Sequence, residues 1–262
     1  MTPHPPSNDI RTADEGPDVQ KIMGVPFWNR TCEELLGRIH DTGGLLVVPS
    51  APSFCSALED EYLLRCHTDA DYAVMDSGYL SLLLGIAARN KRPPRISGYQ
   101  VIEKLLNGIH TPTIAKDKIL WVVPGEETDL AIQKYLEKEG YDLSRMHFYR
   151  APQYRQEFRD ETLFRLAAEF DPKWVVICIS GGRQEKLGFE LRNALPHPPA
   201  ILCTGAAVFF FSGAQARIPK WVDRSYLGWL WRIASDPARF GPRYWNALRL
   251  PLVLLAGARK HS

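Results

Sequence analysis

The sequence lacks the features of a secreted or membrane-spanning protein. Its five cysteines form no CxxC pair and lie in largely apolar segments, which favours buried, reduced thiols over a disulfide scaffold. No run of about 20 apolar residues is present that could span a bilayer. Residues 1–20 contain no apolar segment typical of a secretory signal. We therefore expect a protein on the cytoplasmic side of the cell membrane.

Two common nucleotide-binding patterns are also missing. The chain contains neither the GxGxxG turn of dinucleotide folds nor the P-loop with its lysine. This disfavours an NAD-dependent oxidoreductase, an alternative that tight NAD binding would revive. A large net charge is missing too, because the 262 residues carry a formal charge of only +2. Total charge therefore says little about partners.

Apolar runs alternate with helical patterns between residues 21 and 213. The expected strands are 45–49, 70–75, 119–123, 146–150, 174–179 and 200–203. Continuous aliphatic strands joined by helices predict a Rossmann-like α/β fold, with a mainly parallel sheet covered on both faces. One helix is expected from Pro52 to Cys66, and another begins after Thr31 as its N-cap. Residues 1–20 are expected to form a disordered leader, and residues 214–262 a helical appendage.

Several small or polar residues follow the expected strands, at the edge where open α/β sheets bind ligands. The candidates are Ser50, Asp76, Gly181, Gly182 and Gly205. Asp76 is the strongest, because it ends a strand and a helical pattern follows at once. The alternative is that Asp76 only caps that following helix. Glycines before a helix allow the backbone to approach a phosphate.

The appendage is rich in aromatic and basic residues. From Arg217 to Ser262 nine Lys and Arg stand against two Asp, a net charge of +7 that leaves −5 on the rest of the chain. Tryptophan and arginine together suit the headgroup zone of an anionic membrane. Two other interpretations remain: a helical tail packed on the core with ordinary surface arginines, and a single-stranded nucleic-acid binder, which the acidic remainder disfavours.

Four motifs, taken in order, resemble the WecG/TagA/CpsF glycosyltransferase family between about Ile22 and Leu248. They are VMDSG at 74–78, RISG at 95–98, GGRQE at 181–185, and a tail with RIP at 217–219 and LGWLWR at 227–232. The resemblance implies an enzyme that transfers a sugar from a UDP-sugar to a polyprenyl-diphosphate-linked sugar at the cytoplasmic membrane face. It implies no metal and no other cofactor, and it leaves a homo-oligomer open.

The resemblance also assigns roles to individual residues. Asp76 matches the general base, and Arg95 the arginine that holds a diphosphate. Gln184 and, less securely, Tyr154 match donor-binding positions, with Ser50, Gly181, Gly182 and Gly205 nearby. The tail arginines expected on the acceptor diphosphate are Arg217, Arg232, Arg239 and Arg243. Isolated histidines such as His67 and His110 are weaker candidates for the base.

The chain departs from the family pattern at several polar positions. Val48-Pro49-Ser50 replaces Thr-x-Asn, and Gln100, Phe209 and Gly228 replace acidic residues of the family. These changes leave the transferred sugar open and keep a second hypothesis: a catalytically silent homologue that binds a UDP-sugar or lipid intermediate and scaffolds glycan assembly. Asp69-Ala70-Asp71 spells the DxD of metal-dependent transferases. It precedes its strand instead of ending it, so we assign no metal there.

Overall fold

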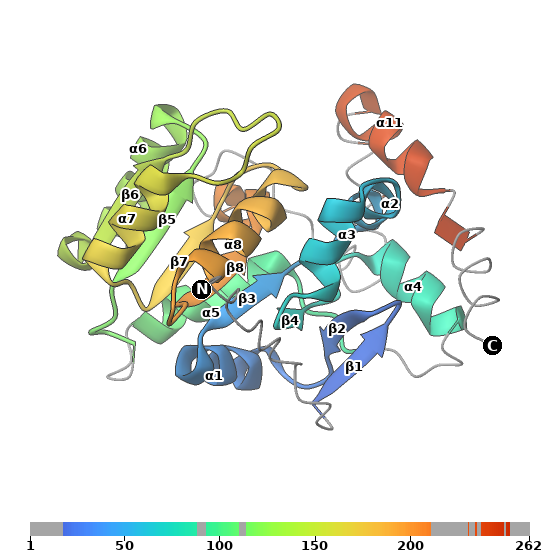
Figure 1. Cartoon of the computed structure of the whole chain (residues 1–262), viewed down its shortest axis with the longest axis horizontal. Coiled ribbons are helices and arrows are strands. Elements are labelled where there is room, and N and C mark those ends of the chain that lie inside the picture. Colours follow the sequence, from blue (N-terminus) through green and yellow to red (C-terminus); the bar gives the residue numbers. More distant parts are fainter. Residues whose placement is uncertain are drawn as a thin grey trace, which may run out of the picture.

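The protein is an α/β structure built on one mixed, mostly parallel sheet (Figure 1). The computed structural model describes residues 18–87, 93–109, 114–210, 230, 234, 237–248 and 250–251. The strands are β1 (Val19–Ile22), β2 (Val25–Trp28), β3 (Gly44–Val47), β4 (Tyr72–Ala73), β5 (Ile119–Val123), β6 (Met146–Arg150), β7 (Trp174–Ile177) and β8 (Ala200–Cys203). Their order is β1-β2-β4-β3-β8-β7-β5-β6, and only the β1/β2 pair is antiparallel. The predicted fold class is confirmed.

Helices cover both faces of this sheet. They are α1 (Cys32–Thr42), α2 (Ala51–Glu59), α3 (Glu61–Thr68), α4 (Gly78–Ala87), α5 (Gly98–Ile109), α6 (Glu126–Lys138), α7 (Glu161–Phe170), α8 (Arg183–Ala194) and α11 (Pro237–Ala247), with 3-10 turns η1 (Leu143–Arg145) and η2 (Gly205–Phe210). Among the described residues, none of these helices combines the length and apolar character needed to cross a bilayer.

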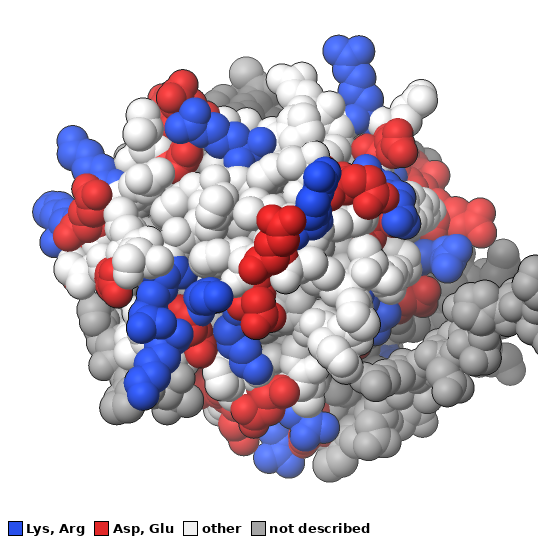
Figure 2. All heavy atoms as spheres, turned by 60° about the vertical axis from the view of Figure 1, so that its left-hand side comes forward, with Lys and Arg blue, Asp and Glu red and all other residues white. Residues whose placement is uncertain are grey.

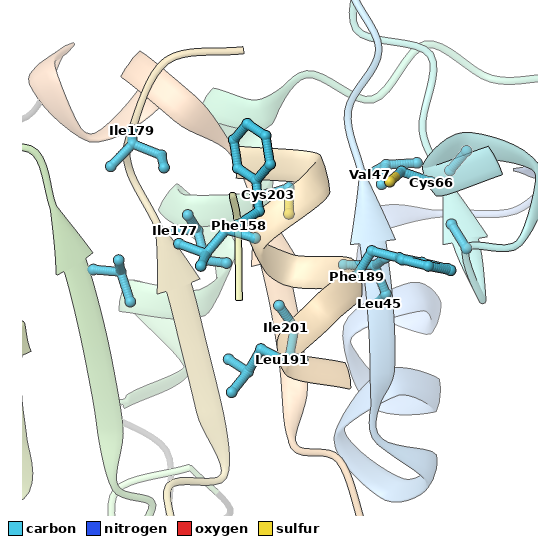
Figure 3. Close-up of a cluster of buried hydrophobic side chains, with 14 of the residues drawn as sticks. Leu45, Val47, Cys66, Phe158, Ile177, Ile179, Phe189, Leu191, Ile201 and Cys203 are labelled. Carbon is cyan, nitrogen blue, oxygen red and sulfur yellow. The ribbon is translucent and has the colours of Figure 1, made fainter. Parts of the chain in front are cut away.

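Alternate residues of each central strand point to opposite faces of the sheet and pack into two separate apolar layers. In β3, Leu45 and Val47 face the layer formed with α2, α3, α4, α7 and α8, whereas Leu46 faces the layer formed with α1, α5 and α6. Figure 3 shows side chains of β3, β7 and β8 meeting Phe189 and Leu191 of α8. Because successive side chains of a strand point to opposite faces and both faces are buried, every residue of these strands is apolar. This explains why the strands appear in the sequence as continuous apolar runs.

The capping signals in the sequence set several helix boundaries. Thr31 forms the predicted N-cap of α1: its Oγ1 accepts a hydrogen bond from Glu34 N–H at 3.3 Å, and Glu34 accepts one from Thr31 N–H at 3.0 Å. The single helix expected from Pro52 to Cys66 is wrong. Asp60 adopts an extended backbone and caps α3 through Leu63 N–H at 3.0 Å, so the chain forms α2 and α3 instead.

The N-terminal edge of the sheet holds two further differences. The sequence predicted no strand before residue 45, yet β1 and β2 form a hairpin there. β1 begins inside the expected leader. β4 spans only two residues of the expected 70–75 strand. Beyond it, the chain pairs with the Arg95 segment through Met75 instead of continuing the ladder.

The described part of the tail packs on the α/β body. α11 lies beside α2 in Figure 1, and its Ala247, with the following Leu250, is fully buried in the same apolar layer as α2 and α3. Trp245 on the same helix is 74% exposed. Most of residues 214–262 lies outside the described residues, so the appendage as a whole remains a prediction.

Candidate active site

The loops that follow β3, β7 and β8 meet at the carboxyl edge of the sheet. β3 and β8 are neighbours, yet the chain leaves β3 into α2 on one face and leaves β8 into η2 on the other. Adjacent parallel strands with such diverging connections form a topological switch point, where open α/β sheets bind ligands. The candidate residues after these strands therefore lie at the expected edge.

Asp76 is held by a helix other than the one it precedes. Ser77 caps α4, because its Oγ accepts a hydrogen bond from Leu80 N–H at 3.3 Å. Asp76 Oδ1 instead accepts one from Gly98 N–H, at the first residue of α5, at 3.2 Å. The capping alternative is therefore wrong for α4. The carboxylate lies at the amino end of α5, where the helix dipole favours a negative charge.

Arg95 lies directly against Asp76. Its Nε donates a hydrogen bond to the backbone carbonyl of Asp76 at 3.1 Å, and Ile96 N–H donates one to the carbonyl of Met75 at 3.2 Å. Two segments that the sequence separates by 19 residues thus form one unit. A guanidinium and a carboxylate are therefore brought together at the sheet edge.

A pocket of about 190 Å³ opens next to this unit. The residues that line it are Val48, Ser50, Pro52, Ser53, Ser56, Leu63, Gly181, Gly182, Gln184 and Glu185. Four of the predicted donor-binding residues are therefore brought together around one hollow. They come from the loops after β3 and β7 and from the first turn of α8, and β8 lies between β3 and β7.

Glu185 organises one wall of this pocket. Its side chain is 1% exposed, and its Oε2 accepts a hydrogen bond from Gly182 N–H at 2.6 Å. Its Oε1 accepts one from Gln184 Nε2 at 3.0 Å. Gly182 has a φ of +84°, a left-handed conformation that favours glycine. Gln184 is itself only 5% exposed, so its amide is fixed where it meets the pocket.

The end of β8 connects the pocket to Asp76. Gly205 has a φ of +57°, and a Cβ atom there would lie 3.2 Å from Gln184 Oε1. One residue earlier, the carbonyl of Thr204 would lie 3.3 Å from a Cβ on Gly98, the residue that binds Asp76. A Cβ on Gly98 would also lie 3.5 Å from Val48, which lines the pocket. Gly98 and the end of β8 therefore lie between Asp76 and the pocket.

Tyr154 does not line this pocket. Its side chain is 7% exposed, and its hydroxyl donates a hydrogen bond to Asp160 Oδ2 at 2.6 Å, as does the hydroxyl of Tyr149 at 2.7 Å. Burial, followed by the nearby Asp160 carboxylate, raises the pKa of Tyr154 well above its usual range. The structure thus gives Tyr154 a packing position, and its donor contact stays a prediction.

The tail arginines cannot be placed around the site. Arg217 and Arg232 lie outside the described residues, as does His110. Arg239 and Arg243 fall on α11, but their side chains also lie outside the described part of the chain. Their predicted contact with an acceptor diphosphate therefore stays a prediction.

The acidic pair Asp69 and Asp71 lies away from the candidate site. Asp71 accepts hydrogen bonds from Arg192 Nε and Nη2 and from Leu45 N–H, at the amino end of β3. The opposite edge of the sheet carries Asp76, because β3 and β4 run parallel. Within the described residues, no three His, Cys, Asp or Glu side chains lie close enough together to hold a metal ion.

His67 and four of the five cysteines are buried in the core, whereas Cys55 is half-buried. His67 is fully buried, with Nδ1 hydrogen-bonded to Leu63 O at 2.8 Å, which does not suit a base for a bound substrate. No disulfide joins the five cysteines, as predicted. Burial raises the pKa of Cys32 and of Cys66 to about 12, so these thiols stay protonated and unreactive.

Sequence reasoning missed part of the pocket. Ser53 and Ser56 continue from Ser50 at a spacing of three residues, on the side of α2 that faces the pocket. Glu185 follows Gly182 by three residues, the spacing of a capping box. Both spacings can be read from the sequence, so they are the signals that could have identified these pocket residues.

Comparison with known proteins assigns the chain to a family. The model of the glycosyl transferase WecG/TagA/CpsF family matches residues 20–262, nearly the whole chain. No curated protein sequence matches the chain significantly. The matched region contains the Asp76 and Arg95 unit, the pocket, and the tail with α11. The chain therefore belongs to the WecG/TagA/CpsF family of glycosyltransferases.

Proposed function

We propose that this protein is an inverting glycosyltransferase. It moves one hexose or hexosamine-type sugar from a UDP-sugar to a polyprenyl-diphosphate-linked saccharide, in the synthesis of an exopolysaccharide or another surface glycan. It works as a peripheral protein at the cytoplasmic face of the cell membrane. The observation that carries the proposal is the short path from Asp76, through Gly98 and the end of β8, to the pocket that holds Gln184.

The proposed reaction needs a base and a donor site side by side. Asp76 takes the proton from the acceptor hydroxyl as that oxygen attacks the anomeric carbon, while UDP leaves from the opposite side of the sugar. Inversion follows from this single displacement. Gln184, Ser50 and the Gly181-Gly182 turn bind the donor on the pocket side.

The diphosphate groups need positive charge on the other side. Arg95 is joined to the Asp76 backbone and is half-buried, so its guanidinium is held in place before a ligand binds. A permanently charged, planar guanidinium suits phosphate oxygens. The tail arginines Arg217, Arg232, Arg239 and Arg243 complete the binding of the acceptor diphosphate in this proposal.

Association with a membrane is supported by exposed apolar side chains on the described tail. Trp245 and Leu248 are 74% and 50% exposed, while the neighbouring Ala247 is buried. Tryptophan is favoured at the boundary between headgroups and acyl chains. We propose that this side of α11 lies against the membrane that holds the lipid-linked acceptor.

The test is release of UDP by the purified protein from a panel of UDP-sugars, with and without a short-chain polyprenyl-diphosphate-linked sugar. Acceptor-dependent release from one donor supports the proposal and names that donor. Binding of UDP without release from any donor and acceptor pair favours the silent scaffold instead. Tight binding of NAD without binding of UDP contradicts both.

A further inference from the structure

The first turn of α5 holds Asp76 and is itself held by Gln100. Gln100 Oε1 accepts a hydrogen bond from Ser97 N–H at 2.9 Å, and Ser97 Oγ accepts one from Gln100 N–H at 3.1 Å. This reciprocal pair is a capping box, which satisfies N–H groups at the start of a helix. Gly98, the residue after Ser97, donates its N–H to Asp76 Oδ1 at 3.2 Å. Gln100 and Asp76 therefore accept hydrogen bonds from two successive N–H groups.

Packing confines this turn on its inner side. Gly98 is buried, and a Cβ there would lie 3.3 Å from the carbonyl oxygen of Thr204 and 3.5 Å from Val48 Cγ1. Gln100 is exposed, so its side chain can be replaced without opening a cavity in the core. The capping box is thus the support, on the solvent side, of the turn that binds Asp76.

Gln100 supplies this support without a charge. It stands where the family pattern has an acidic residue, and glutamine and glutamate both form a capping box. A carboxylate at this position would accept the hydrogen bond from Ser97 N–H, next to the donor that binds Asp76. Two like charges on neighbouring donors disfavour the ionised form of each other. The amide of Gln100 avoids that repulsion.

The other charged groups near this turn are Arg95 and Glu103. Arg95 precedes the turn and donates to the backbone carbonyl of Asp76. Glu103 lies one turn further along α5, and its Oε1 accepts the hydroxyl of Tyr99 at 3.1 Å. The sequence places no charged residue in α4, in η2 or at 48–50, and α4 contributes only Tyr79 as a titratable group. A carboxylate at position 100 would therefore add a negative charge to a turn that has few others around it.

We propose that Gln100 is a positioning residue for the catalytic base, and that its neutral amide favours the ionised form of Asp76. The inference rests on the proposed function, in which Asp76 takes the proton of the acceptor hydroxyl. The capping box fixes the N–H group that orients the Asp76 carboxylate. The missing charge at position 100 lets that carboxylate work as a base at lower pH. Gln100 acts through Gly98 and Asp76, not on a substrate.

Two substitutions separate the support from the charge. Gln100→Ala breaks the capping box, and we expect kcat for acceptor-dependent UDP release to fall about three- to tenfold, with the affinity for UDP unchanged, because only the base is displaced. Gln100→Glu keeps the box, so kcat should be restored above pH 7. Its acid limb in the pH–rate profile should move up by about half a unit or more, because the added charge disfavours the ionised base.

The matched control is Glu34→Ala. Thr31 and Glu34 form the same kind of capping box at the start of α1, and Glu34 is also exposed. α1 contributes no residue to the described pocket or to the Asp76 and Arg95 unit, so kcat and the pH profile should match those of wild type. An unchanged kcat in Gln100→Ala overturns the positioning role. A profile in Gln100→Glu that matches wild type overturns the role of the neutral amide.

Hydrogen–deuterium exchange of residues 95–101 tests the geometry without turnover. We expect faster exchange in Gln100→Ala, and exchange like that of wild type in Gln100→Glu and Glu34→Ala. Unchanged exchange in Gln100→Ala overturns the inference whatever the activity. If exchange changes as expected but wild type releases no UDP with any acceptor, the proposed function fails and the support of Asp76 by Gln100 stands.

Discussion

Asp160 illustrates how a single residue combines capping with charge. It caps α7 through Leu163 N–H at 3.0 Å and also accepts the hydroxyls of Tyr149 and Tyr154. Burial alone would raise the pKa of Asp160, but the hydrogen bonds from Tyr154, Leu163 and Tyr149 outweigh it and leave the pKa below its usual value of 3.8. The ionised form is therefore favoured in the folded protein.

This arrangement predicts a pH-dependent loss of stability in Asp160→Asn. Asparagine is an equally good N-cap, so the substitution removes mainly the charge that the two tyrosines stabilise. A group with a lowered pKa stabilises the fold above its unfolded pKa and loses that contribution as pH falls through its folded pKa. We expect a cost of about 1–2 kcal/mol at pH 7.

Urea unfolding of wild type and Asp160→Asn at pH 7, 5 and 3 measures this difference. The gap between the two proteins should be constant from pH 7 to 5 and shrink below the usual pKa of 3.8. A gap that stays the same at pH 3 would show that the charge of Asp160 does not matter.

At the scale of secondary-structure elements, α8 packs closely against the sheet at Gly188. A Cβ on Gly188 would lie 2.8 Å from Cys203 Sγ and 2.9 Å from Leu45 Cδ1, closer than packed atoms approach. Gly188→Ala should therefore cost about 1–3 kcal/mol, because the helix must move away from β3 and β8.

A second glycine provides the matched control. Gly37 is exposed in α1, and a Cβ there would meet nothing within 4 Å. Gly37→Ala should stabilise the protein by up to about 1 kcal/mol through helix propensity. Thermal unfolding of both variants tests the packing of α8, and a stabilised Gly188→Ala would contradict it.

Another prediction concerns the link between α8 and the amino edge of the sheet. Asp71→Asn removes the charge that binds Arg192 at 2.7 and 3.0 Å, and we expect a loss of about 2 kcal/mol. Turnover below the melting temperature should persist, because Asp71 lies at the edge opposite Asp76. Loss of turnover in a folded Asp71→Asn protein would revive the metal-binding DxD interpretation.

The elements that sequence predicted well are those with strong local signals. β5 and β8 have the predicted bounds, because their aliphatic runs are buried on both faces. β6 also has the predicted bounds, although it is an edge strand whose residues are half-buried or exposed. The β1/β2 hairpin was missed, since β1 is only partly buried and β2 joins the rest of the sheet through the single pair Phe27 and Ala73. The break at Asp60 was missed because the helical pattern continues on both sides of it.

The candidate site was predicted only in part for a similar reason. Positions at strand ends follow from the sequence, so Asp76 and Ser50 could be expected at the carboxyl edge, and the family resemblance singled out Gln184. The pairing of Arg95 with Asp76 depends on a bridge between Met75 and Arg95 that no local pattern encodes. The burial of Glu185 depends on α3, α8 and the β3 loop meeting in space.

At the scale of the whole molecule, one surface carries mixed charges and another carries exposed apolar side chains. On the side turned forward in Figure 2, the described basic side chains lie among acidic ones, so the described part of this face has no continuous basic surface of the kind nucleic acids require. The end of α11 and the turn that follows it instead expose Trp245 and Leu248. This contrast supports the tail side as the membrane side.

We predict that the double substitution Trp245→Ser and Leu248→Ser weakens binding to anionic lipid vesicles several-fold without lowering the melting temperature, because both side chains are exposed. Vesicle flotation measures the binding. Leu130→Ser is the control, since Leu130 is 55% exposed on α6, at the end of the molecule away from α11 (Figure 1). Equal binding by all three proteins would contradict a membrane-facing α11.

The most direct test of the whole account is acceptor-dependent UDP release by Asp76→Asn, measured beside its affinity for UDP. Asparagine can still accept the hydrogen bond from Gly98 N–H, so the fold and the pocket should persist. We expect turnover to fall by about 10²-fold or more, with UDP affinity within about twofold of wild type, because only the base is lost. Turnover close to wild type would contradict Asp76 as the base and, with it, the proposed active site.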